Sequence, residues 1–166
     1  MEKTGALTLI ILLSVVLFTS GCEEETGAES VQEPFTEFYV LGPEGNADNY
    51  PTDYVLGENG TVILGIVNHE QKPVNYTLEV KLENTSLPLP PDKQYIILRD
   101  NETWEKEVTI TPPFEGKDML LGFLLFNENE KNLLEEGISL PYRDLHIRIN
   151  VSQNTSENGL TQLTGI

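Results

Sequence analysis

The sequence predicts an all-β fold, an immunoglobulin-like antiparallel β-sandwich of about seven or eight strands. Three observations predict it. Apolar residues recur at every second position through most of the central part of the chain. Clusters of Gly, Pro, Asn and Asp interrupt these stretches at intervals of roughly ten residues, which is the spacing of turns in small sandwiches. No comparably long stretch shows the helical period of about 3.6 residues.

The clearest alternation runs from Val74 to Leu82, where five apolar residues alternate with four polar ones. Such a pattern predicts a strand with one buried and one wet face. Residues 145–151 repeat it. Residues 104–110 also repeat it, except that Lys106 stands at an inward position, which indicates a strand at a sheet edge or a lysine whose stem is buried.

Four further stretches are strand candidates: 35–41, 61–67, 94–98 and 119–126. The last is apolar at both odd and even positions, so we expect a central strand that is covered on both faces. A single helical turn is expected within residues 130–137.

Several glycine and aromatic residues are explained by their expected positions in the predicted sandwich. Gly57 and Gly60 predict a turn, and Gly65 inside a strand indicates a bulge or a close approach of another backbone. Trp104 is expected to cap the core. Four aromatic residues are also expected in the core, although they could instead line a sugar-binding face: Tyr39, Tyr50, Tyr54 and Phe126.

The chain divides into four parts. Residues 1–21 are a signal peptide or an N-terminal membrane anchor, residues 22–34 an acidic tether, residues 35–151 the β-sandwich domain and residues 152–166 a flexible tail. No internal repeat is visible.

The amino terminus predicts export. A charged head is followed by 18 uncharged residues from Thr4 to Gly21, and Cys22, the single cysteine, comes directly after small residues. This arrangement resembles a lipoprotein signal and makes Cys22 the candidate for lipidation, although Thr19 stands where a branched aliphatic residue is more usual. Retention of the segment as an uncleaved helix remains open, because roughly 20 apolar residues span a bilayer.

Composition excludes several classes of partner and site. The net charge is −17, and cleavage after Gly21 would leave it unchanged because Glu2 and Lys3 are both removed. Nucleic acids and anionic lipid surfaces are therefore repelled. A single cysteine allows no intramolecular disulfide and no cysteine-based zinc site.

The triplet Asn-x-Ser/Thr occurs six times among 13 asparagines, where composition alone predicts about two. In the predicted fold every one lies in a turn, on the polar face of a strand or in the tail, so a bulky glycan would not disturb the core. Turn preferences of asparagine and threonine would also enrich the triplet. The predicted glycosylation sites are Asn59, Asn75, Asn84, Asn101, Asn150 and Asn154.

The case for catalysis is thin. His69 and His146 are the only histidines, and neither lies in a known catalytic motif. We predict no catalytic, cofactor or metal site. An acidic loop could offer oxygen ligands to calcium, but its spacing matches no standard calcium loop: Glu44, Asn46, Asp48 and Asp53.

The segments "FTEFY", "GIVNHE" and "NETWEK", together with "LLGFLLF" and "YRDLHIRINV", resemble the extracellular domain of an archaeal family of unknown function, numbered 1616. The resemblance covers nearly all of residues 35–151. It implies a surface-exposed, membrane-attached β domain with no assigned activity. It also implies an exterior on which asparagine-linked glycans are expected.

Three functional hypotheses follow. The first is a non-catalytic module, anchored at the cell surface and glycosylated, that contacts other envelope proteins such as an S-layer lattice. The second is a solute- or glycan-binding lipoprotein associated with a transporter, which would need a concave aromatic cleft. The third is a hydrolase accessory or an enzyme.

Overall fold

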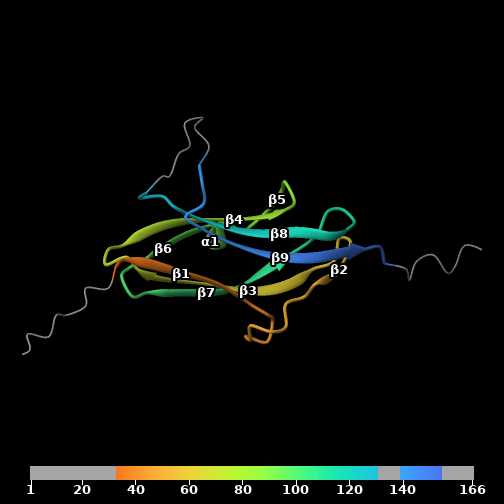
Figure 1. Ribbon diagram of the computed structural model, residues 1–166, viewed down its shortest axis with the longest axis horizontal. Coiled ribbons are helices and arrows are strands. Elements are labelled where there is room, and N and C mark those ends of the chain that lie inside the picture. The colour runs from red at the N-terminus through yellow and green to blue at the C-terminus, as the bar shows by residue number, and fades with distance from the viewer. Residues whose placement is uncertain (1–32, 131–138, 155–166) are drawn as a thin grey trace, which may run out of the picture. The chain divides into compact units, whose positions relative to one another are not determined.

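The computed structural model describes residues 33–130 and 139–154. Two β-sheets pack face to face, which confirms the predicted immunoglobulin-like β-sandwich (Figure 1). The elements in chain order are β1 (Phe35–Leu41), β2 (Asp53–Val55), β3 (Gly60–His69), β4 (Val74–Leu82), β5 (Thr85–Leu87), α1 (Pro91–Gln94), β6 (Tyr95–Leu98), β7 (Thr103–Ile110), β8 (Gly116–Asn127) and β9 (Arg143–Ser152).

The smaller sheet has the strand order β1-β3-β7, and the larger has the order β2-β9-β8-β4. The remaining edge of β4 is shared, because β6 pairs with residues 74–77 and β5 with residues 80–82. All pairs are antiparallel except β2 with β9, which is parallel. The segment 42–52 carries the chain from one sheet to the other, so no tight hairpin sets the direction of β2.

All seven predicted strands are present. The prediction missed β2 and β5, which have three residues each and are too short to show a period. It was wrong at Gln94, which ends the short helix α1 rather than beginning a strand, because Pro91 is favourable in a first helical turn. The helical turn expected in residues 130–137 falls almost wholly outside the described residues.

The core lies between the inward faces of the two sheets. Leu64, Leu78 and Phe123 are completely buried, and each stands in a strand whose alternate residues also point inward. The strand β8 lies between β9 and β4, as its sequence predicts. Its outward residues Leu120 and Leu124 are half-buried, so the strand is partly covered on its second face as well.

The strand β7 forms one edge of the smaller sheet, which confirms the edge position indicated by Lys106. The Lys106 side chain is exposed, and so are those of Glu105 and Glu107, which point to the opposite face of the strand. Charges on an edge strand oppose pairing with other molecules. Trp104, at the start of the strand, is partly buried against the core, as expected.

Gly65 accommodates an aromatic ring. Its neighbour across the β1–β3 pair is Tyr39, and a Cβ at Gly65 would overlap the Tyr39 ring. The register runs through Gly65 without a bulge, so the expectation of a bulge or of a second backbone was wrong. The Tyr39 hydroxyl reaches across Gly65 to donate a hydrogen bond to Glu105 at 2.7 Å. Burial and this carboxylate raise the pKa of Tyr39 to about 12.

The other two glycines differ from each other. Gly57 has a φ of 73°, which suits the predicted turn. Gly60 lies under the ring of Tyr54, which is buried in the core. A side chain at position 60 would occupy the space that this ring fills, so glycine is required there by packing.

Replacing Gly65 with alanine should destabilise the domain by about 1–3 kcal/mol, because the new methyl group displaces the Tyr39 ring. Urea denaturation measures the effect. In a Tyr39→Ala background the same glycine replacement should cost less. Equal costs in both backgrounds would show that the ring is not the reason for the glycine.

Candidate functional site

The six asparagines of the predicted glycosylation triplets are all exposed: Asn59, Asn75, Asn84, Asn101, Asn150 and Asn154. Asn68 and Asn127 are the two buried asparagines among the described residues, and neither belongs to such a triplet. The two asparagines that are buried in the core are therefore not candidates for glycosylation.

The triplets are unevenly distributed over the two sheets. Asn75 in β4 and Asn150 in β9 lie on the outward face of the larger sheet. Asn59, Asn84 and Asn101 lie in connections between strands. None of the three strands of the smaller sheet contains a triplet asparagine. The outward face of that sheet is therefore free of direct attachment points.

The side-chain nitrogens of the triplet asparagines also differ. Those of Asn101, Asn150 and Asn154 donate hydrogen bonds to Asp100, Asp53 and Glu58, respectively. Within the described residues, those of Asn59, Asn75 and Asn84 donate none. A glycan replaces one hydrogen of this nitrogen, so the second group can be modified without competing for an existing hydrogen bond.

The histidines do not form a catalytic constellation. His69 lies 3.3 Å from Glu37 and 2.9 Å from the Asn101 side chain, and its ring contacts that of Phe35. His146 lies on the solvent face of β9, 3.2 Å from Asp144. No hydroxyl of the described residues hydrogen-bonds to either imidazole.

In the described part of the chain, no three His, Cys, Asp or Glu side chains are close enough to share a metal ion. Of the calcium candidates, Asp53 accepts a hydrogen bond from Asn150, and Glu44, Asn46 and Asp48 are exposed in the loop between β1 and β2. No helix in residues 33–130 or 139–154 has the length and hydropathy needed to cross a bilayer. Cys22 and residues 4–21 lie outside these ranges.

The candidate sugar-binding aromatics do not share a face. Tyr39 lies on the outward face of the smaller sheet, Tyr54 is buried in the core and Phe126 lies on the outward face of the larger sheet. Tyr50 is half-buried in the loop before β2. These residues therefore do not build the aromatic cleft that a solute-binding protein would need.

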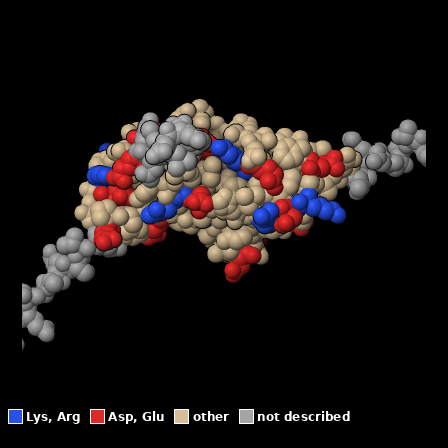
Figure 2. All heavy atoms as spheres, turned by 45° about the horizontal axis from the view of Figure 1, so that its top comes forward, with Lys and Arg blue, Asp and Glu red and all other residues tan. Residues whose placement is uncertain are grey.

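Two open grooves lie on the larger sheet, with volumes of about 360 and 370 Å³. The first runs over Thr77 and Phe126 and is bordered by Glu79, Glu128 and Glu130. The second lies against β5 and is lined by Leu87 and Leu89 among others. On the face seen in Figure 2, acidic and basic side chains are interspersed.

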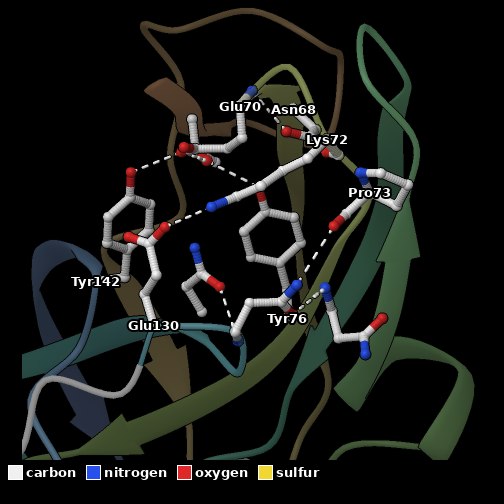
Figure 3. A network of polar contacts seen from close by, with 11 residues as sticks. Asn68, Glu70, Lys72, Pro73, Tyr76, Glu130 and Tyr142 are labelled. Carbon is white, nitrogen blue, oxygen red and sulfur yellow. Dashed lines mark hydrogen bonds and ion pairs between the residues drawn. The ribbon is translucent and has the colours of Figure 1, made fainter. Parts of the chain in front are cut away.

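A polar network centred on Glu70 joins residues of β1, β3, β4 and β6 at one end of the sandwich (Figure 3). The carboxylate of Glu70 accepts hydrogen bonds from Thr36 at 2.7 Å and from Tyr142 at 2.6 Å. The Tyr76 hydroxyl lies 2.8 Å from that of Thr36, whose hydrogen is directed to Glu70, so Tyr76 is the donor. Asn68 accepts a hydrogen bond from the Glu70 backbone and donates to Leu98 and Lys72 carbonyls.

This environment favours neutral phenols. Burial raises the pKa of Tyr76 to about 12, and burial followed by the hydrogen bond to Glu70 raises the pKa of Tyr142. The Arg143 guanidinium stacks on the Tyr142 ring, 4.5 Å from its centroid. The network is therefore a cross-link between strands rather than a source of reactive groups.

Sequence reasoning did not find this network. Asn68 continues the inward positions Val62, Leu64 and Ile66 of its strand, and this period is the signal that could have indicated its burial. No sequence pattern brings Thr36 or Tyr142 to Glu70, because these residues meet only in the folded chain.

The fold and these surfaces define a β-sandwich domain, and no three His, Cys, Asp or Glu side chains of its described residues could share a metal ion. The chain belongs to the family defined as domain of unknown function 1616, which matches residues 29–150. This match confirms the family resemblance seen in the sequence. No sequence among the curated proteins matches the chain.

Solved structures with similar folds have low identity. The CARDB domain of a Pyrococcus furiosus protein, described in complex with di-metal ions, has 12% identity, a TM-score of 0.46, and covers 74% of this chain and 96% of its own. A FixG-related protein from Vibrio parahaemolyticus has 16% identity, a TM-score of 0.45 and coverages of 70% and 95%. A PapD-like domain of a human protein has 10% identity, a TM-score of 0.37 and coverages of 74% and 87%.

The replacement Glu70→Leu should destabilise the domain by about 1–3 kcal/mol more than Glu70→Gln, because only glutamine keeps an acceptor for the buried hydroxyls. Urea denaturation of both variants tests this. Glu130→Gln is the matched control, since the Lys72–Glu130 pair is exposed and should contribute at most about 1 kcal/mol. Equal stabilities of the two Glu70 variants would contradict the network's role.

Stability should fall at alkaline pH. The folded pKa of Tyr76 is raised from 10.0 to about 12 and that of Tyr142 is raised as well, so their neutral forms stabilise the fold. This contribution is complete below pH 10 and is lost as the pH rises through 12. Urea denaturation between pH 8 and pH 12 should show the loss, and Tyr142→Phe should reduce it. A loss unaffected by that variant would place its origin elsewhere.

Proposed function

We propose that this protein is a non-catalytic β-sandwich module, anchored at the cell surface and N-glycosylated, that mediates interactions between proteins of the cell envelope. The apolar segment before Cys22 supports export and attachment by the amino terminus. Attachment is either by lipid on Cys22 or by retention of the segment as a helix. Membership of a family without assigned activity agrees with a non-catalytic role but gives no partner.

One observation carries the proposal: every triplet asparagine is exposed, whereas both buried asparagines of the described residues lie outside triplets. Modification at any of the six positions would leave the packing of the core intact. Asn59, Asn75 and Asn84 are the preferred positions, because their side-chain nitrogens are not engaged elsewhere in the described structure.

The outward face of the smaller sheet is the best candidate for protein contact. Its strands carry no triplet asparagine, so a partner can approach without displacing a directly attached glycan. Half-buried apolar side chains such as Leu41, Ile63 and Val67 lie beside the carboxylates of Glu37 and Glu105. A surface of this kind suits a partner with apolar and basic groups, such as an S-layer or other envelope protein.

The alternative is a solute- or glycan-binding lipoprotein that serves a transporter. It has less support, because the grooves are open and the candidate aromatic residues lie on different faces. Enzymatic activity has less support still, since neither histidine has a nucleophile beside it in the described residues.

Intact-mass analysis of the protein purified from its native membrane tests the proposal. We expect a chain that begins at Cys22 with lipid mass, or a chain that retains residues 1–21, and in both cases additional mass at several asparagines. Peptide mapping should find Asn59, Asn75 and Asn84 among the occupied sites. A mass equal to that of the unmodified translated chain would refute both the lipid and the glycans.

Cross-linking on intact cells tests the contact surface. A photoreactive residue at Ile63 should capture an envelope protein, and the same probe at Asn150, on the opposite outward face, should not. Capture from Asn150 alone would assign the contact to the larger sheet.

A further inference from the structure

The two most exposed large apolar side chains of the described residues are neighbours on β6. Tyr95 is 63% exposed and Ile97 is 71% exposed. Both point outward from the larger sheet, since the residues between and after them, Ile96 and Leu98, are buried. This pair exposes apolar surface that nothing in the described residues covers.

The strand register places this pair opposite one glycosylation triplet. In the antiparallel β4–β6 pair, Asn75 is the partner of Ile97 and Thr77 is the partner of Tyr95. Asn75 and Thr77 are the two defining residues of the triplet, and both point to the outward face. Directly opposite residues have Cβ atoms about 5 Å apart, and an aromatic side chain also reaches its diagonal neighbour. Ile97 and Tyr95 therefore both lie within reach of a group attached to Asn75.

The chemistry of the pair fits a sugar better than a protein. Pyranose rings expose C–H groups on one face, which pack against aromatic rings and aliphatic side chains, while their hydroxyls remain in water. Two side chains offer far less area than the roughly 800 Å² that each partner contributes to a stable protein interface. The Asn75 nitrogen donates no hydrogen bond within the described residues, so the attachment atom is available.

We propose that Tyr95 and Ile97 form a platform on which the first sugars of a glycan linked to Asn75 rest. This inference depends on the glycosylation proposed above. The platform would order the proximal sugars over β6, bury its two apolar side chains and hold a bulky group beside an edge strand. Because exposed apolar edge strands promote aggregation, the glycan would also protect this edge.

Asn84 provides the matched control. It also belongs to an exposed triplet, and its side-chain nitrogen is likewise not engaged within the described residues. It lies in the turn between β4 and β5, where the neighbouring residues Thr85 and Ser86 are polar. Among the described residues, no exposed pair of large apolar side chains lies next to Asn84 in the strand pairing.

The test is a double-mutant cycle on thermal unfolding of protein purified from its native membrane. Asn75→Gln removes the glycan, and Tyr95→Ser with Ile97→Thr removes the platform; all these side chains are exposed, so each variant should fold. We expect Asn75→Gln to lower the Tm by about 3–5 °C when the platform is present and by less than about 1 °C when it is absent. Asn84→Gln should change the Tm by less than about 1 °C in both cases.

Two controls separate the possible failures. The same proteins made in a host without N-glycosylation measure the direct coupling between these cross-strand neighbours, which should be well below the coupling in the glycosylated proteins. Intact mass of each native preparation reports whether Asn75 is occupied. An unoccupied Asn75 would refute glycosylation at this position and the platform with it. An occupied Asn75 whose removal has the same effect with and without the platform would overturn the platform alone.

Discussion

The domain depends on the burial of one face of each strand between two sheets. The fully buried residues Leu78 on β4 and Phe123 on β8 lie in adjacent central strands, and each such side chain contributes about 1.5–3 kcal/mol by leaving water. In a sandwich of two sheets, each strand can turn only one of its faces toward this core. The opposite faces are therefore available for charges, attached groups and partners, and the functional surfaces are a consequence of the packing.

The end of the sandwich near Glu70 is held together by hydrogen bonds between polar side chains. There the inward positions are polar, and a carboxylate replaces apolar side chains between the sheets. A buried carboxylate needs hydrogen-bond donors, and Thr36 and Tyr142 both donate to the Oε1 atom of Glu70 from segments distant in sequence. The family segment "GIVNHE" contains both Asn68 and Glu70, so its polar residues have a structural explanation that requires no ligand.

The two outward faces have different properties. The larger sheet carries triplet asparagines within its strands, an exposed apolar pair on β6 and an open groove over Thr77 and Phe126. The smaller sheet carries no triplet within its strands and is bordered by the charged edge of β7. A glycosylated larger sheet and an unmodified smaller sheet would give the domain one solvated side and one side for contact.

The sequence by itself determined the long strands and the direction in which their side chains point, because a period of two is a local property of each segment. It thereby determined the position of β8, the edge indicated by Lys106 and the outward direction of Asn75. Only the tertiary structure decided the parallel pairing of β2, the ring of Tyr39 over Gly65, the partners of Glu70 and the position of Ile97 opposite Asn75. Each of these depends on which distant segments become neighbours, and that is set by the packing of the whole chain.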